Sequence, residues 1–456
     1  MKNSKKEIYS LLRDSYEGEG GFLDGSYLIQ HKRELPENYS RRKKLAYYLN
    51  YFKPCIDAHV SPIFKVLAKR DYKGAGANAW AEFIKDVDFR GTEIKDLMKQ
   101  AAHEAKLSGI TFIVMDKEQD ANPRNLAELE GDRNNLPYAF VVSAARVNEI
   151  ILDKHGRIVS FEYEEQDEYE ENAVAKRTFT KDGWVLEDTK GRHEASWNLG
   201  CVPVIAIPSR VVEGNFNPFL PSEFISIAKT NAIIYNMCSW LNEILVNQTF
   251  SILTYPSTSE ESLVVGTNNA LGYPADASHE PNFIAPPADP ANILSAQIEK
   301  LQNECYRMAG VVNVTGVRSE QSGVAKQWDY EQTNQTLADF ADILEGVEKK
   351  LARLFARFTG VDFDYTVNYP SDFTISDIDT ELKNAEIAKG LSFGNAFNLE
   401  IYKKVLTSYL PELSDEDFDY MVKEYQEALK QQELDYSQEQ NPFKKINTDD
   451  NVDDEE

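Results

Sequence analysis

The sequence predicts an α+β protein in which long helices follow a set of short strands. Two observations lead to this prediction. Apolar residues recur at helical spacing through two segments, 222–253 and 291–358. Between residues 110 and 207, by contrast, short runs rich in β-branched and aromatic residues are separated by turn residues, as is typical of strands. A chain of 456 residues can bury a large core and is long enough for two or more structural units.

The stretch 291–358 shows the clearest pattern. Pro290 lies where its first helix should begin, a position that tolerates a residue without an N–H donor. An apolar stripe then follows at spacings of four, three, four and three residues: Leu294, Ile298, Leu301, Cys305 and Met308. A second stripe runs from Leu337 to Phe358, and a helix over 325–358 would be roughly 50 Å long. Because the first third of that helix is polar on all sides, we expect it to leave the core at one end.

A loop with glycines at 310, 316 and 323 joins these two helices. It is apolar at four positions where a surface loop would be polar: Val311, Val312, Val314 and Val317. Such valines favour contact with something outside the monomer. The pattern alone leaves open an ordinary helical hairpin packed within a core.

The net charge restricts the possible partners. The chain has 75 acidic residues against 49 Lys plus Arg, a formal charge of −26. This balance argues against a conventional nucleic-acid clamp, which would present a basic face. It is compatible with a protein that surrounds DNA without gripping it, because like charges repel.

Sequence motifs give no sign of catalysis, of a metal or of a cofactor. The four cysteines contain no CxxC pair and are typical of buried residues in a reducing compartment. His103-Glu104 lacks the second histidine of a zinc protease, and no phosphate-binding glycine loop or nucleophile elbow occurs. No run of 18 apolar residues exists and the first residues lack an apolar signal core, so we expect neither a membrane span nor a signal peptide.

The part before residue 222 predicts a loose arm and then an α/β unit. Residues 1–39 are Gly-rich and polar, as expected for the arm. The basic run Arg41–Lys44 opens a helix, and a solvated helix start is favoured over phosphate contact. We predict helix over 78–107 and a buried strand at Ile110–Met115. Shorter strands follow at 138–142, 149–152, 158–163, 176–180, 184–187 and 201–207.

From Ser222, a plausible N-cap, a long helix begins whose apolar surface is too broad for one neighbour. The Pro-, Ser- and Gly-rich segment 254–289 then carries about two strands, near 263–265 and 282–284. After residue 358 we expect a return strand at 363–368 and helices at 378–389, 399–410 and 415–429. The tail from Gln431 has nine acids against two lysines and is expected to be disordered.

Four segments, taken in order, resemble the portal, or head-to-tail connector, proteins of tailed bacteriophages. Residues 51–64 are similar to the family's early wing helix, and Ala105–Asp116 to its step from helix through glycine to strand. Gly200–Ile205 followed by Pro221–Asn236 resembles the family's entry into the stem. Ser322–Glu331 resembles the step from tunnel loop to long helix. The resemblance covers residues from about 40 to 430, and its strength is the ordered series rather than any single motif.

The resemblance implies a portal-like layout, in this order: N-terminal arm 1–39, α/β wing 40–221, first stem helix 222–253, clip 254–289, second stem helix 290–309, tunnel loop 310–324, long wing helix and return strand 325–374, helical crown 375–430 and acidic tail 431–456. The clip is short for the family, and the crown is also small, which implies a slight role for the crown. The family layout further implies a closed ring, a dodecamer, with double-stranded DNA passing through it. The implied partners are a terminase packaging motor, a head-tail adaptor and the major capsid protein. The implied location is the capsid vertex of a virion, and the host cytoplasm during assembly.

Two sets of candidate site residues follow, neither of them catalytic. The DNA-channel set takes six residues of the tunnel loop and the first lysine beyond it: Val311, Val312, Val314, Val317, Arg318, Gln321 and Lys326. The subunit-interface set lies on the two stem helices: Ile234, Met237, Trp240, Leu241, Ile244, Ile298 and Leu301. The alternatives are an acidic capsid scaffold or adaptor protein, and an intracellular enzyme with a helical appendage.

Overall fold

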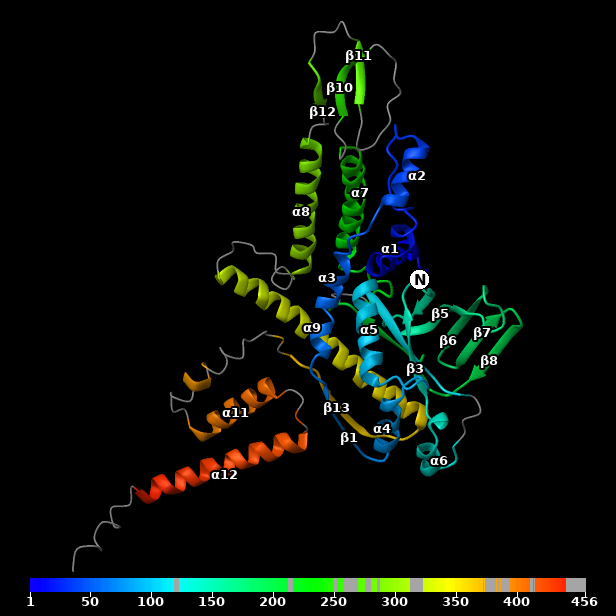
Figure 1. The fold of residues 1–456 in the computed structure, drawn as a ribbon. Coiled ribbons are helices and arrows are strands. Elements are labelled where there is room, and N and C mark those ends of the chain that lie inside the picture. The colour runs from blue at the N-terminus through cyan, green and yellow to red at the C-terminus, as the bar shows by residue number, and fades with distance from the viewer. Residues whose placement is uncertain are drawn as a thin grey trace, which may run out of the picture. The chain divides into compact units, whose positions relative to one another are not determined.

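The structure, a computed structural model, describes residues 1–118, 123–211, 216–248, 252–257, 270–274, 280–284, 288–311, 323–371, 373, 383, 385–387, 394–410, 413 and 415–439. The chain divides into two compact units, Met1–Phe373 and Thr374–Glu456, and each is described by itself. The first unit combines helices with four small sheets (Figure 1).

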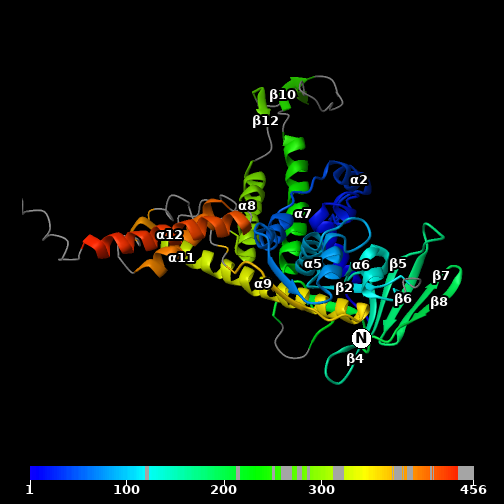
Figure 2. The ribbon, with the colours of Figure 1, turned by 90° about the horizontal axis from the view of Figure 1, so that it is seen from below.

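Nine named α-helices lie in the described part of the first unit: α1 (Lys6–Glu17), α2 (Pro36–Leu45), α3 (Phe52–Ala58), α4 (Ala77–Lys85), α5 (Ile94–Ser108), α6 (Leu126–Gly131), α7 (Ile225–Gln248), α8 (Asp289–Ala309) and α9 (Gly323–Thr359). Short 3-10 turns occupy Gly20–Phe22, Ser61–Phe64 and Arg133–Asn135. Figures 1 and 2 both show α9 (yellow) crossing the unit toward the sheets.

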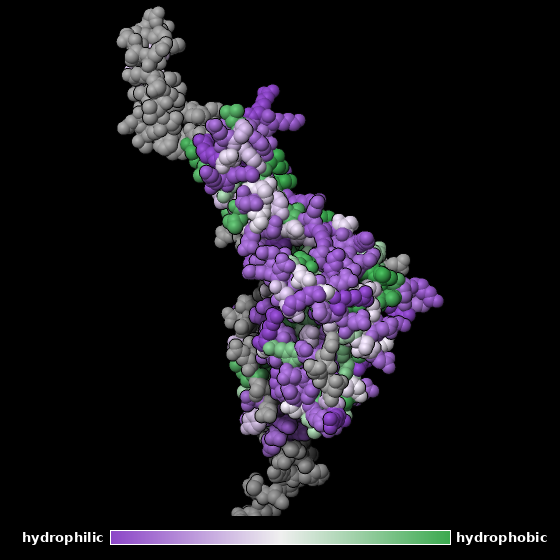
Figure 3. Space-filling view, turned by 90° about the vertical axis from the view of Figure 1, so that its right-hand side faces the viewer, coloured by the Kyte–Doolittle hydropathy of each residue, from purple (hydrophilic) through white to green (hydrophobic). Residues whose placement is uncertain are grey.

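The strands form four separate sheets. One has the order β3-β2-β9, from β2 (Ile110–Asp116), β3 (Tyr138–Ser143) and β9 (Val204–Pro208), and all its pairs are antiparallel. An antiparallel meander comprises β4 (Val147–Leu152), β5 (Ile158–Gln166), β6 (Val174–Thr180), β7 (Gly183–Asp188) and β8 (Gly191–Ser196). The side of the unit that carries α2 and this meander is largely hydrophilic (Figure 3).

Two further sheets link distant segments. Strand β1 (Lys69–Lys73) pairs with β13 (Asp364–Asn368), so the chain after α9 returns to the N-terminal half. Between α7 and α8, β10 (Ile252–Ser257) lies between β11 (Ala270–Pro274) and β12 (Asn282–Ile284). This small sheet lies beyond the ends of α7 and α8 (Figure 1).

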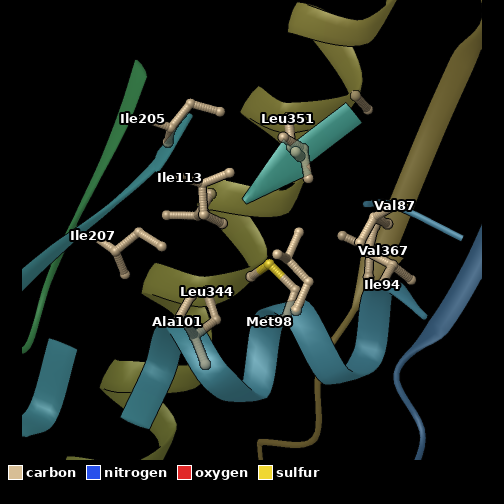
Figure 4. Packing of buried hydrophobic residues seen from close by; sticks show 14 of the residues in the cluster. Val87, Ile94, Met98, Ala101, Ile113, Ile205, Ile207, Leu344, Leu351 and Val367 are labelled. Atoms are coloured by element: carbon tan, nitrogen blue, oxygen red, sulfur yellow. The ribbon is translucent and has the colours of Figure 1, made fainter. Parts of the chain in front are cut away.

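Strand β2 explains why the unit has two large hydrophobic cores. All seven of its residues are buried, and its side chains alternate between two faces. Ile113 and Met115 face the first core with Ile205, Ile207 and residues of α4, α5 and α9. Phe112 and Val114 face the second core with α1, α3, α7 and α8. Figure 4 shows the first core, in which side chains of α5 and α9 pack against those of β2 and β9.

Helix α9 is held to β1 and to the end of β13 by a buried carboxylate. Glu348 is fully buried, and its oxygens accept hydrogen bonds from Arg70 Nε (2.6 Å), Tyr365 Oη (2.5 Å) and Tyr369 Oη (2.6 Å). A buried charge is tolerated when it is paired and hydrogen-bonded in this way. The network fixes the position of α9 against the β1–β13 pair.

The N-terminal segment differs most from expectation. Residues 1–39 were expected to form a loose arm, but α1 buries Tyr9, Leu12 and Tyr16 in the second core. Residues at the start of the chain also extend the meander, because Ile150 N donates to Met1 O (3.0 Å) and Asn3 N to Asn148 O (2.8 Å). The prediction of a loose arm was wrong because glycines near residue 20 obscured the apolar periodicity of α1.

Three smaller expectations about the α/β unit also need correction. The basic run 41–44 ends helix α2 instead of opening a helix, and its Arg42 is buried. The helix predicted over 78–107 is interrupted between α4 and α5, where Phe89 has a positive φ of 63°. Strands β1 and β8 were missed, since both are charged and mostly exposed, and exposed strands lack an apolar alternation. The other strands predicted in this unit are present.

The second unit contains α11 (Asn395–Tyr409) and α12 (Asp415–Glu439). Their contact includes stacked rings of Tyr402 and Tyr425, 4.1 Å apart. Helix α12 continues past Gln431, so the disorder expected from that residue was wrong as far as Glu439; residues 440–456 lie outside the described residues, as does most of the helix predicted at 378–389. Hydrophobic i, i+4 spacing ends near residue 429, and nothing in the polar sequence beyond it signalled the extra turns.

Candidate subunit-contact site

Helices α7 and α8 pack against each other and against the second core. Ile234 and Cys238 of α7 are buried in this core together with Ile298 and Cys305 of α8. The two helices are the flanks that the sequence predicted around the segment 254–289, and the strand predicted at 282–284 is present as β12. The strand predicted near 263–265 lies outside the described residues. Helices packed on one side in this way leave their other sides for further contacts.

A glycine and a buried ion pair fix the start of α7. Gly109 has a φ of 95°, and a Cβ there would collide with the main chain of Leu220–Ser222 as it enters the helix. Lys106 is almost fully buried, and its Nζ donates to Glu223 Oε1 at 2.8 Å. Burial lowers the pKa of Lys106, and the Glu223 carboxylate opposes that shift. Ser222 Oγ donates to the Lys106 carbonyl (3.1 Å) and accepts from Phe224 N (3.2 Å). Because α7 begins at Ile225, Ser222 holds the turn before the helix and is not the N-cap that the sequence predicted.

The end of α8 is held at two successive carbonyls. His59 Nε2 donates to Ala309 O at 2.7 Å, and Thr333 Oγ1 of α9 donates to Gly310 O, also at 2.7 Å. Burial lowers the pKa of His59, which keeps the ring neutral. Gly310 adopts a φ of 69°, a helix end that glycine permits. These bonds set where the segment after α8 begins.

A second side of α7 is covered by the N-terminal segment through polar side chains. Asn231 Oδ1 accepts from Tyr51 N (2.9 Å), and Asn236 Oδ1 accepts from Ile29 N (2.7 Å). Ser239 Oγ accepts from Arg42 NH1 at 2.8 Å, and the Arg42 guanidinium also binds both Glu34 oxygens. Main-chain groups of residues 27–51 thus find partners on α7. The spacing of Asn231, Asn236, Ser239 and Asn242 along an apolar helix was the sequence signal for this side, and it was overlooked.

The third side of α7 is apolar and open to solvent. Ile233, Met237, Trp240 and Ile244 recur at spacings of four, three and four residues, so they share one helix face. Ile233 is 52% exposed and Trp240 is 38% exposed. Large apolar side chains aligned on one exposed face are typical of an interaction surface. Met237 is half-buried and packs against the second core. We call the other three residues, Ile233, Trp240 and Ile244, the open α7 face.

The structure separates the predicted interface residues into two groups. Trp240 and Ile244 lie on the open α7 face together with Ile233, whereas Met237 is half-buried and packs against the second core. Ile234 and Ile298 are buried within the protomer, and Leu241 and Leu301 pack against the same core, so these four side chains hold the chain's own helices together. Sequence periodicity could not divide them, because it shows which residues share a stripe and not which neighbour covers it.

The predicted channel residues fall mostly outside the described residues. Val312, Val314, Val317, Arg318 and Gln321 are not described, and Lys326 is described only as part of α9. Val311 is 1% exposed and belongs to the second core, so this valine packs inside its own protomer. Its apolar character is therefore explained by the fold.

The described residues contain no group of three or more His, Cys, Asp or Glu side chains that could hold a metal ion. None of the helices in the described parts of the chain is long and apolar enough to cross a membrane. The open α7 face offers apolar contact, and hydrogen-bonded neighbours lie beside it.

No family model matches the sequence, and no curated protein does. Among solved structures, the chain is similar to a chain in the neck of an empty gene transfer agent (GTA) particle computed with C6 symmetry, with a TM-score of 0.46 and 11% identity over 88% of this chain and 93% of that chain. It is also similar to a chain of the native GTA virion, with a TM-score of 0.41 and 11% identity over 85% and 89%. A chain in the neck of the native GTA particle computed with C12 symmetry gives a TM-score of 0.40 and 10% identity over 82% and 89%.

Proposed function

We propose that this chain is the ring-forming portal subunit of a phage-like particle. Copies would close around a channel, and double-stranded DNA would pass through it during packaging and ejection. The observation that carries the proposal is the insertion of a small sheet, β10 to β12, between two paired helices. This is the stem–clip–stem order of the portal family, and α9 follows it as the long wing helix.

The open α7 face supports assembly into a ring. The core with α8 and the N-terminal segment cover two sides of α7, and the third side carries three apolar residues outside the core, Ile233, Trp240 and Ile244. A second copy of the chain is the occupant we propose for this face. When one surface of a protomer contacts a different surface of the next copy, the repeated contact closes into a ring if the rotation permits.

The sheet β10 to β12 is the proposed docking site for a terminase packaging motor and, later, a head-tail adaptor. It lies beyond the ends of α7 and α8, and in the sequence residues 249–251 and 285–288 connect it to those helices. Replacing 252–284 by a short linker should therefore leave the remaining unit folded and abolish motor or adaptor binding. Packaging that continues at the parental level after this deletion would contradict the assignment.

The negative charge of the chain fits a channel that lets DNA slide. At −26 per chain, a ring repels phosphate at long range, and the Debye length at physiological salt is about 8 Å. Binding of free duplex DNA should be weak and should not fall as salt rises. Tight binding at low salt that is lost at moderate salt would reveal a basic holding surface instead.

Arg318 is the proposed point of direct phosphate contact, because it is the one Lys or Arg between residues 310 and 323, with Lys326 next along the chain. Rings with Arg318→Ala should assemble normally but change packaging length or DNA retention. Parental packaging and retention in that variant would remove Arg318 from the channel. In the competing explanation, Arg318 pairs with the carboxylate of Glu320 and does not contact phosphate. Glu320→Gln tests this explanation in the same assay.

Electron microscopy of the purified full-length protein tests the proposal as a whole. We expect closed rings with a central hole. Particles with the mass of a monomer or dimer across a range of salt and protein concentrations would contradict it, and would favour the alternatives of an adaptor or an enzyme.

A further inference from the structure

The proposed ring and channel assign no role to a groove between α9 and β9. Two adjoining cavities, of about 400 Å³ and about 230 Å³, lie between the C-terminal half of α9 and strand β9. Both are lined by Lys350, Val204 and Ile205, so they form one elongated groove. We call it the α9–β9 groove.

One wall of the groove is cationic. Lys350, Arg353 and Arg357 are exposed and line it, and their spacing of three and four residues places them in a row on one face of α9. Within the described part of the chain, these three side chains form neither an ion pair nor a side-chain hydrogen bond. Lys349, the neighbour on the next face, does pair with Glu345 (2.6 Å).

No Asp or Glu is among the described residues that line either cavity. This is unusual for a chain with 75 acidic residues and 49 Lys plus Arg. The floor is apolar and includes Val202, Val204 and Leu354. An occupant that suits the groove therefore carries negative charge on one side and apolar side chains on the other.

The opposite wall is a sheet edge. In the order β3-β2-β9, strand β9 pairs only with β2. Met115 N donates to Pro203 O and Ser209 N to Gly109 O, so the odd-numbered residues of β9 exchange hydrogen bonds with β2. Alternation directs the N–H and C=O of Ala206 to the other edge, which borders the groove. An open edge of this kind accepts an added strand.

We propose that the α9–β9 groove binds an extended, acidic peptide segment of a partner protein, which adds to β9 as a strand and places its carboxylates against Lys350, Arg353 and Arg357. In an extended segment alternate side chains face opposite ways, so one set meets the cations and the other meets the apolar floor. Nucleic acid fits less well, because stacking of bases needs aromatic platforms and the described lining offers only Phe216.

The test is fluorescence anisotropy with the full-length protein and a labelled probe peptide that alternates Glu with Val and Ile over eight residues. We expect saturable binding that weakens at least tenfold in the double variant Arg353→Glu/Arg357→Glu. The matched control is Arg90→Glu, a charge reversal at an exposed arginine outside the groove, which should bind like the parent.

Two further probes separate strand addition from simple charge attraction. A peptide of the same sequence, N-methylated at alternate residues so that it cannot donate to the open edge of β9, should bind at least tenfold more weakly. A single-stranded oligonucleotide of equal charge should bind less tightly than the peptide. The proposal is overturned if the parent protein does not bind the peptide. It is also overturned if the N-methylated peptide binds the parent as well as the unmodified peptide does, or if the Arg353→Glu/Arg357→Glu variant binds the unmodified peptide as well as the parent does. Equally tight binding of the oligonucleotide, with the same dependence on Arg353 and Arg357, would overturn it as well.

Discussion

Helices α7 and α9 are both long and only partly covered by the rest of the unit, but the side chains on their uncovered sides differ. Helix α7 is covered on two sides and leaves an apolar row, Ile233 to Ile244, on the third. Helix α9 buries its apolar stripe in the first core and leaves a cationic row, Lys350 to Arg357. An apolar row is stabilised by removal from water, whereas a cationic row is stable in water and gains from an anionic partner.

This contrast agrees with the two proposals, in which α7 contacts another copy of the chain and α9 binds a separate partner. The open α7 face favours a permanent partner such as another copy of the chain, because exposed apolar surface is a liability in a free monomer. The cationic row of α9 favours a partner that binds and leaves. Internal polar groups differ as well: α7 uses amide side chains to hold main-chain groups, and α9 uses one buried charge.

The largest expected loss of stability comes from the buried charge of α9. Glu348→Gln should lower the free energy of unfolding by about 3–5 kcal/mol, because it leaves the buried guanidinium of Arg70 without its counter-charge. Urea denaturation followed by circular dichroism measures this loss. Asp342→Asn, at an exposed position on the same helix, is the control and should change stability by no more than about 0.5 kcal/mol. Equal stability of the two variants would show that Glu348 does not hold α9 in place.

A second buried carboxylate, Asp116, sharpens the contrast, because its cationic partner is more distant than that of Glu348. Burial raises the pKa of Asp116 to about 6, and the Lys117 N–H and the Arg177 guanidinium, 3.5 Å away, only partly oppose the shift. The folded state therefore binds the proton more tightly than the unfolded chain, whose pKa is near 3.8. Stability falls as pH rises from about 4 through about 6, and above that range the charged carboxylate destabilises the fold.

Asp116→Asn removes this titration. The variant should gain stability relative to the parent as pH is raised from 4 to 8, by on the order of 2–3 kcal/mol in total. Denaturation curves at several pH values give the difference between the two proteins. A difference that does not change with pH would mean that Asp116 titrates normally and is held as well as Glu348.

The amide contacts of α7 should contribute less than the charge of α9. Asn236→Ala leaves Ile29 N and Tyr27 O without their partner and should cost about 1–3 kcal/mol. Hydrogen exchange should become faster at Ile29 while remaining slow in β2. Lys229→Ala, an exposed change on the same helix, should leave both quantities unaltered. Unchanged exchange at Ile29 in the Asn236 variant would show that other contacts hold the N-terminal segment on α7.

Strong periodicity made α7, α8 and α9 predictable from sequence, since burial on one side leaves a stripe that spacing reveals. The same was true of β2, whose residues are apolar on both faces because it separates two cores. The pairing of β1 with β13 could not be predicted, because it joins residues almost 300 positions apart and has an exposed, charged strand. For the candidate site, the sequence placed Met237, Trp240 and Ile244 on one stripe but could not show that Met237 packs against the protomer's own core while Trp240 stays exposed.

The α9–β9 groove also could not have been found from the sequence. Lys350, Arg353 and Arg357 have the spacing of an ordinary solvated helix face, and only the fold brings them beside the open edge of β9. Arg42 gives the opposite lesson, because a cation in a basic run turned out to be buried against Glu34 and Ser239. The sequence gives the formal charge of a side chain, but it does not show whether that side chain is exposed to water or buried in protein.

The smallest effect on the protomer and the most direct test of its assembly come from the open α7 face. Ile233→Asp/Trp240→Asp changes two exposed side chains, so the fold of one chain should lose little stability. Mass photometry of the parent should give one particle whose mass is a high multiple of 51.8 kDa, and the double variant should give monomers. Val159→Asp, at an exposed apolar residue of β5, should assemble like the parent. A monomeric parent, or a double variant that still forms the parental particle, would contradict the account.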